Sequence, residues 1–167
     1  TNTNLELIGE PLGYGTEAIT TNADTHTSTV ADGASDAARA MYVKYTGTLD
    51  STCTITIAPN TMKRVQIIEN ATSGSQSIII KQGSGSTVTI PTGRVAVVYL
   101  DGAGSGGAVV NAFTDLDLAG TLSIAGAVAA ATDMTVGDDL TLSSDAAVLG
   151  FGADTDVTLT HVADTAL

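Results

Sequence analysis

The sequence predicts an all-β protein, in which a small antiparallel β-sandwich of jelly-roll type is followed by a repetitive β-shaft. Seven short alternating segments, separated by turn residues, lie between residues 40 and 112. From residue 115 to 144 the chain divides into six-residue units: DLDLAG, TLSIAG, AVAAAT, DMTVGD and DLTLSS. The composition agrees, because Trp is absent, Phe occurs only twice, and small and β-branched residues suit thin sandwiches and solenoids.

Three parts follow from these patterns. Residues 1–35 are rich in Thr, Asn, Asp and Ala with little periodicity, and we expect an extended N-terminal arm or attachment segment. Residues 36–113 should form the sandwich. Residues 114–167 should form the shaft, which we expect to continue beyond residue 167. At the start of the sandwich, residues 35–40 predict one helical turn with Ser35 or Asp36 as its cap.

The sandwich strands are predicted from alternation between turn signals such as Gly47, Pro59 and Gly74. Within residues 52–57, the spacing puts Cys53, Ile55 and Ile57 on one face and threonines on the other. The adjacent Val97 and Val98 indicate a strand that is buried on both faces. The predicted strands are 41–46, 52–58, 63–69, 77–81, 87–90, 94–100 and 108–112. Spacings near ten residues are typical of a small sandwich or jelly roll.

The six-residue units have apolar residues at their second and fourth positions, so each predicts a short strand with one buried face. A single strand of about five residues cannot bury its own face, so the units must stack on each other or on other chains. We expect three chains to pack together here, while a few hairpins of an ordinary β-domain remain the alternative. The predicted oligomer interface consists of Leu116, Leu118, Leu122, Ile124, Val136, Leu140 and Leu142.

Charge is sparse and unevenly placed. Only 14% of residues are charged, and the net charge is −12. Residues 1–95 hold six basic and eight acidic residues, whereas residues 96–167 hold ten Asp and no basic residue. The last part of the chain therefore cannot neutralise phosphates, so nucleic acid is not an expected partner. Anionic membrane surfaces would repel it, and no apolar run approaches the ~20 residues of a membrane span.

No catalytic, cofactor-binding or metal-binding residue is predicted. GAGSGG at residues 102–107 is followed by a strand pattern rather than the helix that a dinucleotide fingerprint needs, so we expect a hairpin loop. GFGADTDVT at residues 150–158 matches a calcium nonapeptide only in part and predicts an Asp-rich turn. No spacing pairs His26, His161 and Cys53 as metal ligands or as a nucleophile and its base. Cys53 is expected in the core.

Two stretches resemble a known group of proteins. IIENATSGSQSIIIKQGSGSTVTIPTGRVAVVYLDGAGSGGAVVNA, residues 67–112, resembles a module in virion structural and tail-fibre proteins of marine tailed bacteriophages, including cyanophages. GDDLTLSSDAAVLGFGADTDVTLTHVADT, residues 137–165, resembles a segment in fibre proteins of the same viruses. The resemblance implies a fibre whose N-terminal region is fixed to the virion and whose shaft leads to a distal host-binding tip. It transfers no functional residue.

We therefore expect a non-enzymatic virion protein, a homotrimeric phage tail-fibre subunit. Its N-terminal region would dock on a tail adaptor or another virion protein, and a distal part would bind the host receptor. A capsid decoration protein or head fibre is the first alternative, because it needs the same trimeric sandwich. A carbohydrate-binding module of a surface protein is the second. A depolymerase ranks last, since it would need a carboxylate-lined groove.

Overall fold

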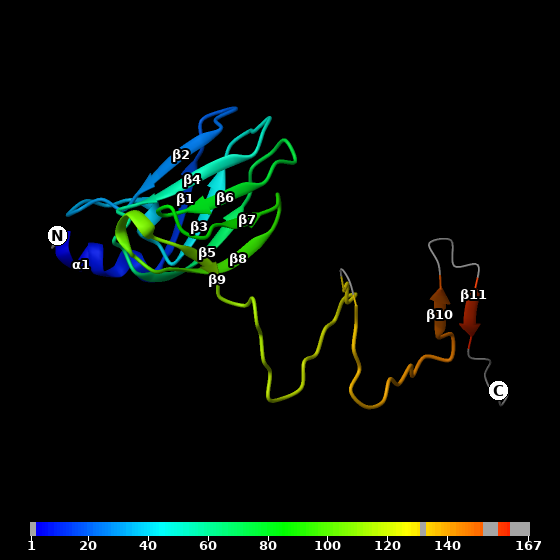
Figure 1. The fold of residues 1–167 in the computed structure, drawn as a ribbon. Coiled ribbons are helices and arrows are strands. Elements are labelled where there is room, and N and C mark those ends of the chain that lie inside the picture. The colour runs from blue at the N-terminus through cyan, green and yellow to red at the C-terminus, as the bar shows by residue number, and fades with distance from the viewer. Residues whose placement is uncertain (1–2, 131–132, 152–156, 161–167) are drawn as a thin grey trace. The chain divides into compact units, whose positions relative to one another are not determined.

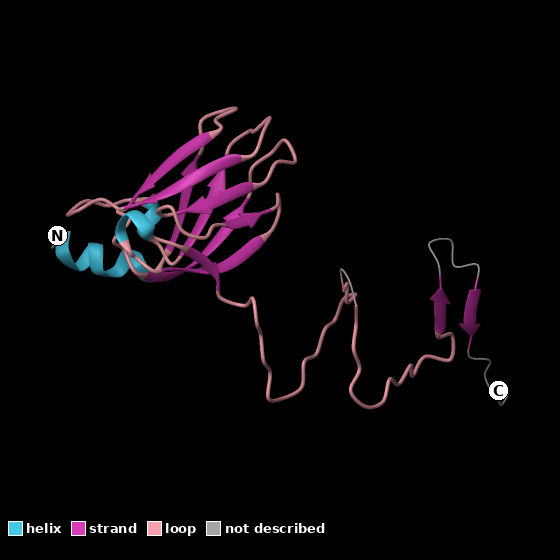
Figure 2. Cartoon of the chain, viewed as in Figure 1, coloured by secondary structure: helices cyan, strands magenta, loops and turns pink. Residues whose placement is uncertain are grey.

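The chain divides into two compact units, Thr1–Leu118 and Ala119–Leu167, which are described here one at a time. A computed structural model describes residues 3–130, 133–151 and 157–160 (Figure 1). The first unit begins with helix α1 (Thr3–Gly9) and the 3₁₀ turn η1 (Glu10–Leu12). The rest of this unit is built from β-strands (Figure 2).

Nine strands of the first unit form two facing sheets. One sheet has the order β1-β3-β5-β8-β9, with β1 at Tyr14–Ala18, β3 at Tyr42–Thr46, β5 at Arg64–Asn70, β8 at Val95–Leu100 and β9 at Val109–Asn111. The other has the order β2-β4-β6-β7, with β2 at Thr25–Thr29, β4 at Cys53–Ala58, β6 at Ile78–Lys81 and β7 at Val88–Ile90. Each of the seven predicted sandwich strands is found, and the all-β prediction is confirmed.

The antiparallel prediction is wrong, because both sheets are mixed. From β1 to β6 the chain alternates between the two sheets, so each of β1 to β4 pairs with the strand two places later and runs parallel to it. Three coils, β1–β2, β3–β4 and β5–β6, therefore stack on one another. Only β7, β8 and β9 return in antiparallel fashion, against β6, β5 and β8. Local alternation predicts strands but carries no information on their direction.

The stretch expected to form an extended arm contributes the first of these coils. Residues of β1 pair with β3, and residues of β2 pair with β4, so residues 14–29 form one edge of each sheet. The predicted helical turn is found as η2 (Ala37–Arg39), and Asp36 is its N-cap, accepting a hydrogen bond from the Arg39 amide. The parallel ladders supply the backbone partners that these polar segments need, which explains how a stretch of low hydrophobicity becomes ordered.

The core lies between the two sheets and is rich in isoleucine. Cys53, Ile55 and Ile57 of β4 are buried as predicted, and Ile55 is directly opposite Ile80 in the parallel ladder. The largest fully buried side chains also include Tyr45 and Leu49. Each buried isoleucine contributes roughly 1.5–3 kcal/mol relative to an exposed one, so stacking three coils of them stabilises a thin sandwich without Trp or Phe.

Glycines close the corners where the chain passes from one sheet to the other. Gly47 and Gly74 occupy corners of successive coils, with φ of 124° and 95°. A Cβ at Gly74 would lie 1.8 Å from the Leu49 carbonyl oxygen, and a Cβ at Gly47 would lie 2.5 Å from that of Ile19. The coils can hydrogen-bond at these corners, as Ser73 N does to Gly47 O at 2.8 Å, because no side chain intervenes.

In the second unit, β10 (Val148–Phe151) and β11 (Val157–Thr160) form an antiparallel hairpin. The described residues of the predicted shaft that precede it, 114–130 and 133–147, contain no strand. The six-residue units thus do not form strands within a single chain, consistent with their having no second layer of their own to pack against. The Asp-rich turn predicted near residue 154 and His161 lie outside the described residues.

Candidate functional site

The predicted interface residues are exposed, and the single chain does not gather them into a core. Each of the seven side chains is between 41% and 63% exposed; they are Leu116, Leu118, Leu122, Ile124, Val136, Leu140 and Leu142. Val128 and Met134, two further apolar residues at the second positions of their units, are likewise exposed. Soluble chains rarely leave so many large apolar side chains open along one segment unless a partner covers them.

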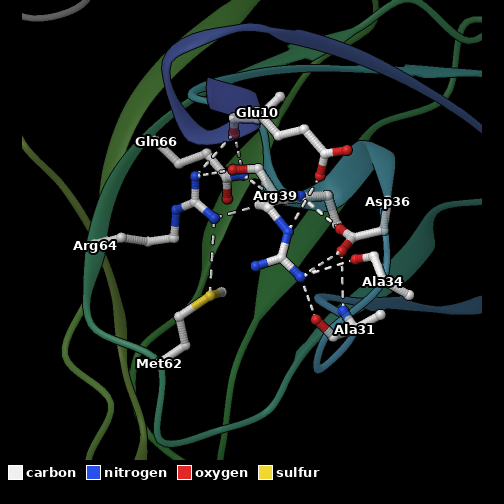
Figure 3. Close-up of polar contacts among 10 residues, drawn as sticks. Glu10, Ala31, Ala34, Asp36, Arg39, Met62, Arg64 and Gln66 are labelled. Carbon is white, nitrogen blue, oxygen red and sulfur yellow. Dashed lines mark hydrogen bonds and ion pairs between the residues drawn. The ribbon is translucent and has the colours of Figure 1, made fainter. Parts of the chain in front are cut away.

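A cluster of polar side chains surrounds Arg39 where β3 begins (Figure 3). The Arg39 guanidinium donates to the carbonyl oxygens of Ala31 and Ala34, lies 3.2 Å from an Asp36 carboxylate oxygen and lies 3.3 Å from one of Glu10. Asp36 also accepts from the Ala31 amide at 2.9 Å. Arg39 therefore ties η1 to the loop that precedes η2, and both carboxylates are already paired with it.

Arg64 and Gln66 complete this cluster from β5. The Arg64 guanidinium donates to the carbonyl oxygens of Arg39 and Ala40, and the Gln66 amide donates to those of Ala38 and Ala40 at 2.8 and 3.0 Å. These are carbonyls at the end of η2 that lack a partner within the turn itself. Burial lowers the pKa of Arg64 from its ordinary value, but the group stays charged because that ordinary value is so high.

Two shallow hollows border the cluster. One, of about 320 Å³, is lined by Glu10, Tyr14, Asp36 and neighbouring backbone. The other, of about 380 Å³, is lined by apolar residues, including Leu12, Met41, Met62 and Val65, and by the basic residues Arg39, Lys63 and Arg64. The acidic groups of the first hollow are paired with Arg39, so they do not form the free carboxylate pair that glycoside hydrolysis requires. The second hollow combines apolar and basic side chains.

A second polar group joins the two sheets at β1 and β2. Glu17 accepts from Ser28 Oγ at 2.5 Å with one carboxylate oxygen, and the other lies 2.7 Å from His26 Nε2. Tyr45 donates its hydroxyl to Ser28 Oγ at 2.9 Å. Desolvation on burial raises the pKa of Tyr45 above its ordinary value. Glu17 and Tyr45 belong to one sheet, whereas His26 and Ser28 belong to the other.

This Glu-His-Ser group does not have the connections of a hydrolase triad. In a triad the imidazole accepts the proton of the serine, and the carboxylate lies behind the imidazole. Here the carboxylate of Glu17 is in the middle, and Ser28 donates to that carboxylate while being fully buried. The arrangement suits a link between the sheets rather than an attack on a substrate.

Sequence reasoning missed this link, because Glu17 and His26 are nine residues apart in a segment with little periodicity. The available signal was weak: His26 and Ser28 alternate with Thr25, Thr27 and Thr29, as in a strand with one polar inner face. Recognising the pair requires knowing that β1 and β2 occupy facing sheets of the same coil. Cys53, by contrast, is found in the core as expected, and burial raises its pKa.

Other candidate sites and comparisons give no further assignment. Within the described ranges, no group of three or more His, Cys, Asp or Glu residues could hold a metal ion. None of the helices in the described part of the chain has the length and apolarity that a membrane crossing needs. No protein-family model, curated protein or solved structure matches this chain.

Proposed function

We propose that this chain is a subunit of a homotrimeric phage tail fibre that performs no chemistry. The phage assignment rests on the resemblance of residues 67–112 and 137–165. One observation supports association between chains: seven apolar residues of the six-residue units are exposed in the single chain, where the described residues 114–130 and 133–147 contain no strand. Their spacing favours short one-sided strands, which become stable only when other chains supply the second layer. A shaft of intertwined chains satisfies that requirement.

The two units have different roles in this proposal. The sandwich belongs to the first compact unit, and it would fix the fibre to a tail adaptor or another virion protein. The six-residue units would then join three chains into a shaft that carries the receptor-binding part away from the particle. Several tips binding together raise the overall affinity for a host surface through effective concentration, without any strong single contact.

The arrangement of polar groups agrees with a mechanical role. The buried or half-buried ionic groups of the first unit are used to hold loops and sheets together: Arg39 pairs with Glu10 and Asp36, and Glu17 joins β1 to β2. These contacts rigidify the sandwich at the edge formed by the N-terminal coil. A body that transmits force between a virion and a shaft needs such links.

Aspartate at a shaft position should prevent assembly. We expect Leu122→Asp or Leu140→Asp to convert the trimer to monomers, because an uncompensated carboxylate buried between chains costs several kcal/mol. Light scattering coupled to size-exclusion chromatography measures the mass directly. Ser123→Asp and Thr141→Asp are the matched controls, since they add the same charge at the neighbouring polar positions of the same units.

The controls should remain trimeric. Intact trimers in both leucine variants would rule out a shaft built from the six-residue units. Antibodies against residues 1–118 then locate the assembly on virions by electron microscopy. Labelling of the head instead of the tail would contradict the tail-fibre assignment.

A further inference from the structure

The two sheets of the first unit present very different outer faces. In β2 and β4, the residues that alternate with the buried ones are almost all threonines, including Thr25, Thr27, Thr54 and Thr56. We call these four residues the threonine face. The corresponding outward positions of the other sheet are mostly apolar. Six of these outward residues form a surface that we call the apolar face: Tyr14, Val65, Ile67, Val95, Val97 and Tyr99.

The apolar face is continuous across the sheet. Val65 lies directly opposite Tyr99, and Ile67 lies directly opposite Val97, in the β5–β8 ladder. Tyr14 extends the surface to β1, where its ring stacks on that of Tyr42 at a centroid distance of 5.4 Å. Tyr14, Val65 and Val95 are each more than half exposed. Sandwich strands usually carry polar residues on the side that faces water, as the threonine face does.

Charge on this side of the sheet is neutralised internally. Lys44 Nζ lies 3.4 Å from one carboxylate oxygen of Glu69, and Tyr42 donates its hydroxyl to the other at 2.8 Å. This hydrogen bond is the first cause of the raised pKa of Tyr42. The pair adds no net charge, although the chain as a whole carries −12.

We infer that the apolar face packs against a second copy of this chain. Interfaces between identical subunits are the most apolar class, rich in Tyr and poor in unpaired charge, and the apolar face has that composition. A positively charged partner would be bound through unpaired acidic groups, and the apolar face has none. Two copies that each carry −12 repel each other least where both surfaces are neutral, as this face is. The inference rests on the self-association proposed above and adds a second contact, between the sandwiches.

The test places two lysines on either sheet of the full-length chain. Val65→Lys/Tyr99→Lys alters a directly opposed pair of the apolar face. Thr27→Lys/Thr56→Lys is the matched control, since it alters a directly opposed pair of the threonine face and changes the net charge equally. Sedimentation equilibrium gives the dissociation constant. We expect the first variant to weaken association at least about tenfold and the control less than about twofold.

Three results overturn the inference or separate it from the proposed shaft. If Leu122→Asp dissociates the protein while Val65→Lys/Tyr99→Lys does not, the shaft stands and the apolar face is not an interface. The opposite result leaves the apolar face as the interface and removes the shaft. A wild-type monomer at all concentrations removes both.

Folding is checked by circular dichroism. If the lysine pair unfolds the protein, Val65→Thr/Tyr99→Thr replaces it, because threonine is well tolerated on the outer face of the other sheet. This milder pair must still weaken association for the inference to hold.

Discussion

Tyr45 shows how one hydroxyl can hold two sheets together. It is fully buried, and it donates to Ser28 of the opposite sheet, which in turn donates to Glu17. Tyr45 can donate in this chain of hydrogen bonds only while its hydroxyl keeps its proton. Burial raises the pKa of Tyr45, so the neutral phenol is favoured in the folded state and the phenolate only after unfolding.

Tyr45→Phe should destabilise the protein by about 1 kcal/mol near neutral pH, since Ser28 Oγ loses its donor. The unfolded tyrosine ionises near pH 10.0, below the folded value, so this residue's contribution to stability is complete below that pH and falls as pH rises above it. Phenylalanine does not titrate. The destabilisation caused by the substitution should therefore shrink on going from about pH 7 to about pH 11.

Urea unfolding at both pH values measures this difference. Thr27→Val is the control, because it removes a hydroxyl at an exposed position of β2, and it should change stability by less than about 0.5 kcal/mol. A destabilisation by Tyr45→Phe that stays constant with pH would mean that Tyr45 is accessible to water in the folded protein.

At the scale of elements, the corner between sheets decides whether the coils stack. Gly74→Ala should destabilise the protein by more than about 2 kcal/mol, because φ is 95° and the new Cβ would meet the Leu49 carbonyl oxygen. Gly93→Ala is the matched control: its φ is 70°, but nothing lies within 4 Å of the added Cβ. That variant should lose about 1 kcal/mol, from backbone strain alone.

Thermal unfolding followed by circular dichroism compares the two variants. Equal losses would show that the φ angle matters and the close approach of the coils does not. A loss at Gly74 that clearly exceeds the loss at Gly93 assigns the excess to the contact between corners.

The same corners explain what the sequence could and could not predict. In β4, Cys53, Ile55 and Ile57 alternate with polar residues, so a strand with one buried face is visible locally. In β2, only Ser28 is fully buried, and the strand owes its order to pairing with β4, whose partner residues lie 29 positions away. Pairing between residues so far apart in the chain produces no periodic pattern in the sequence. Strand direction could not be predicted for the same reason, because it depends on the chain crossing from one sheet to the other at each corner.

At the scale of the whole molecule, charge opposes the association proposed here. Residues 96–167 carry ten Asp and no basic residue. Bringing copies together concentrates nine of these carboxylates, all except that of Asp101, in the segment that is proposed to form the shaft. The apolar residues must offset that repulsion, and the balance between the two depends on ionic strength.

Salt should therefore strengthen self-association. Raising NaCl from about 0.01 M to about 1 M shortens the Debye length from about 30 Å to about 3 Å, which screens the repulsion between carboxylates but leaves apolar contacts in place. We expect the dissociation constant, measured by sedimentation equilibrium, to fall over this range. Asp138→Asn/Asp139→Asn removes two of the charges, so it should associate more tightly at low salt and respond less to added NaCl.

Weaker association at high salt would instead indicate that attraction between opposite charges holds the copies together. That result would contradict both interfaces argued above, since the shaft positions are apolar and the apolar face carries only an internally paired Lys44 and Glu69.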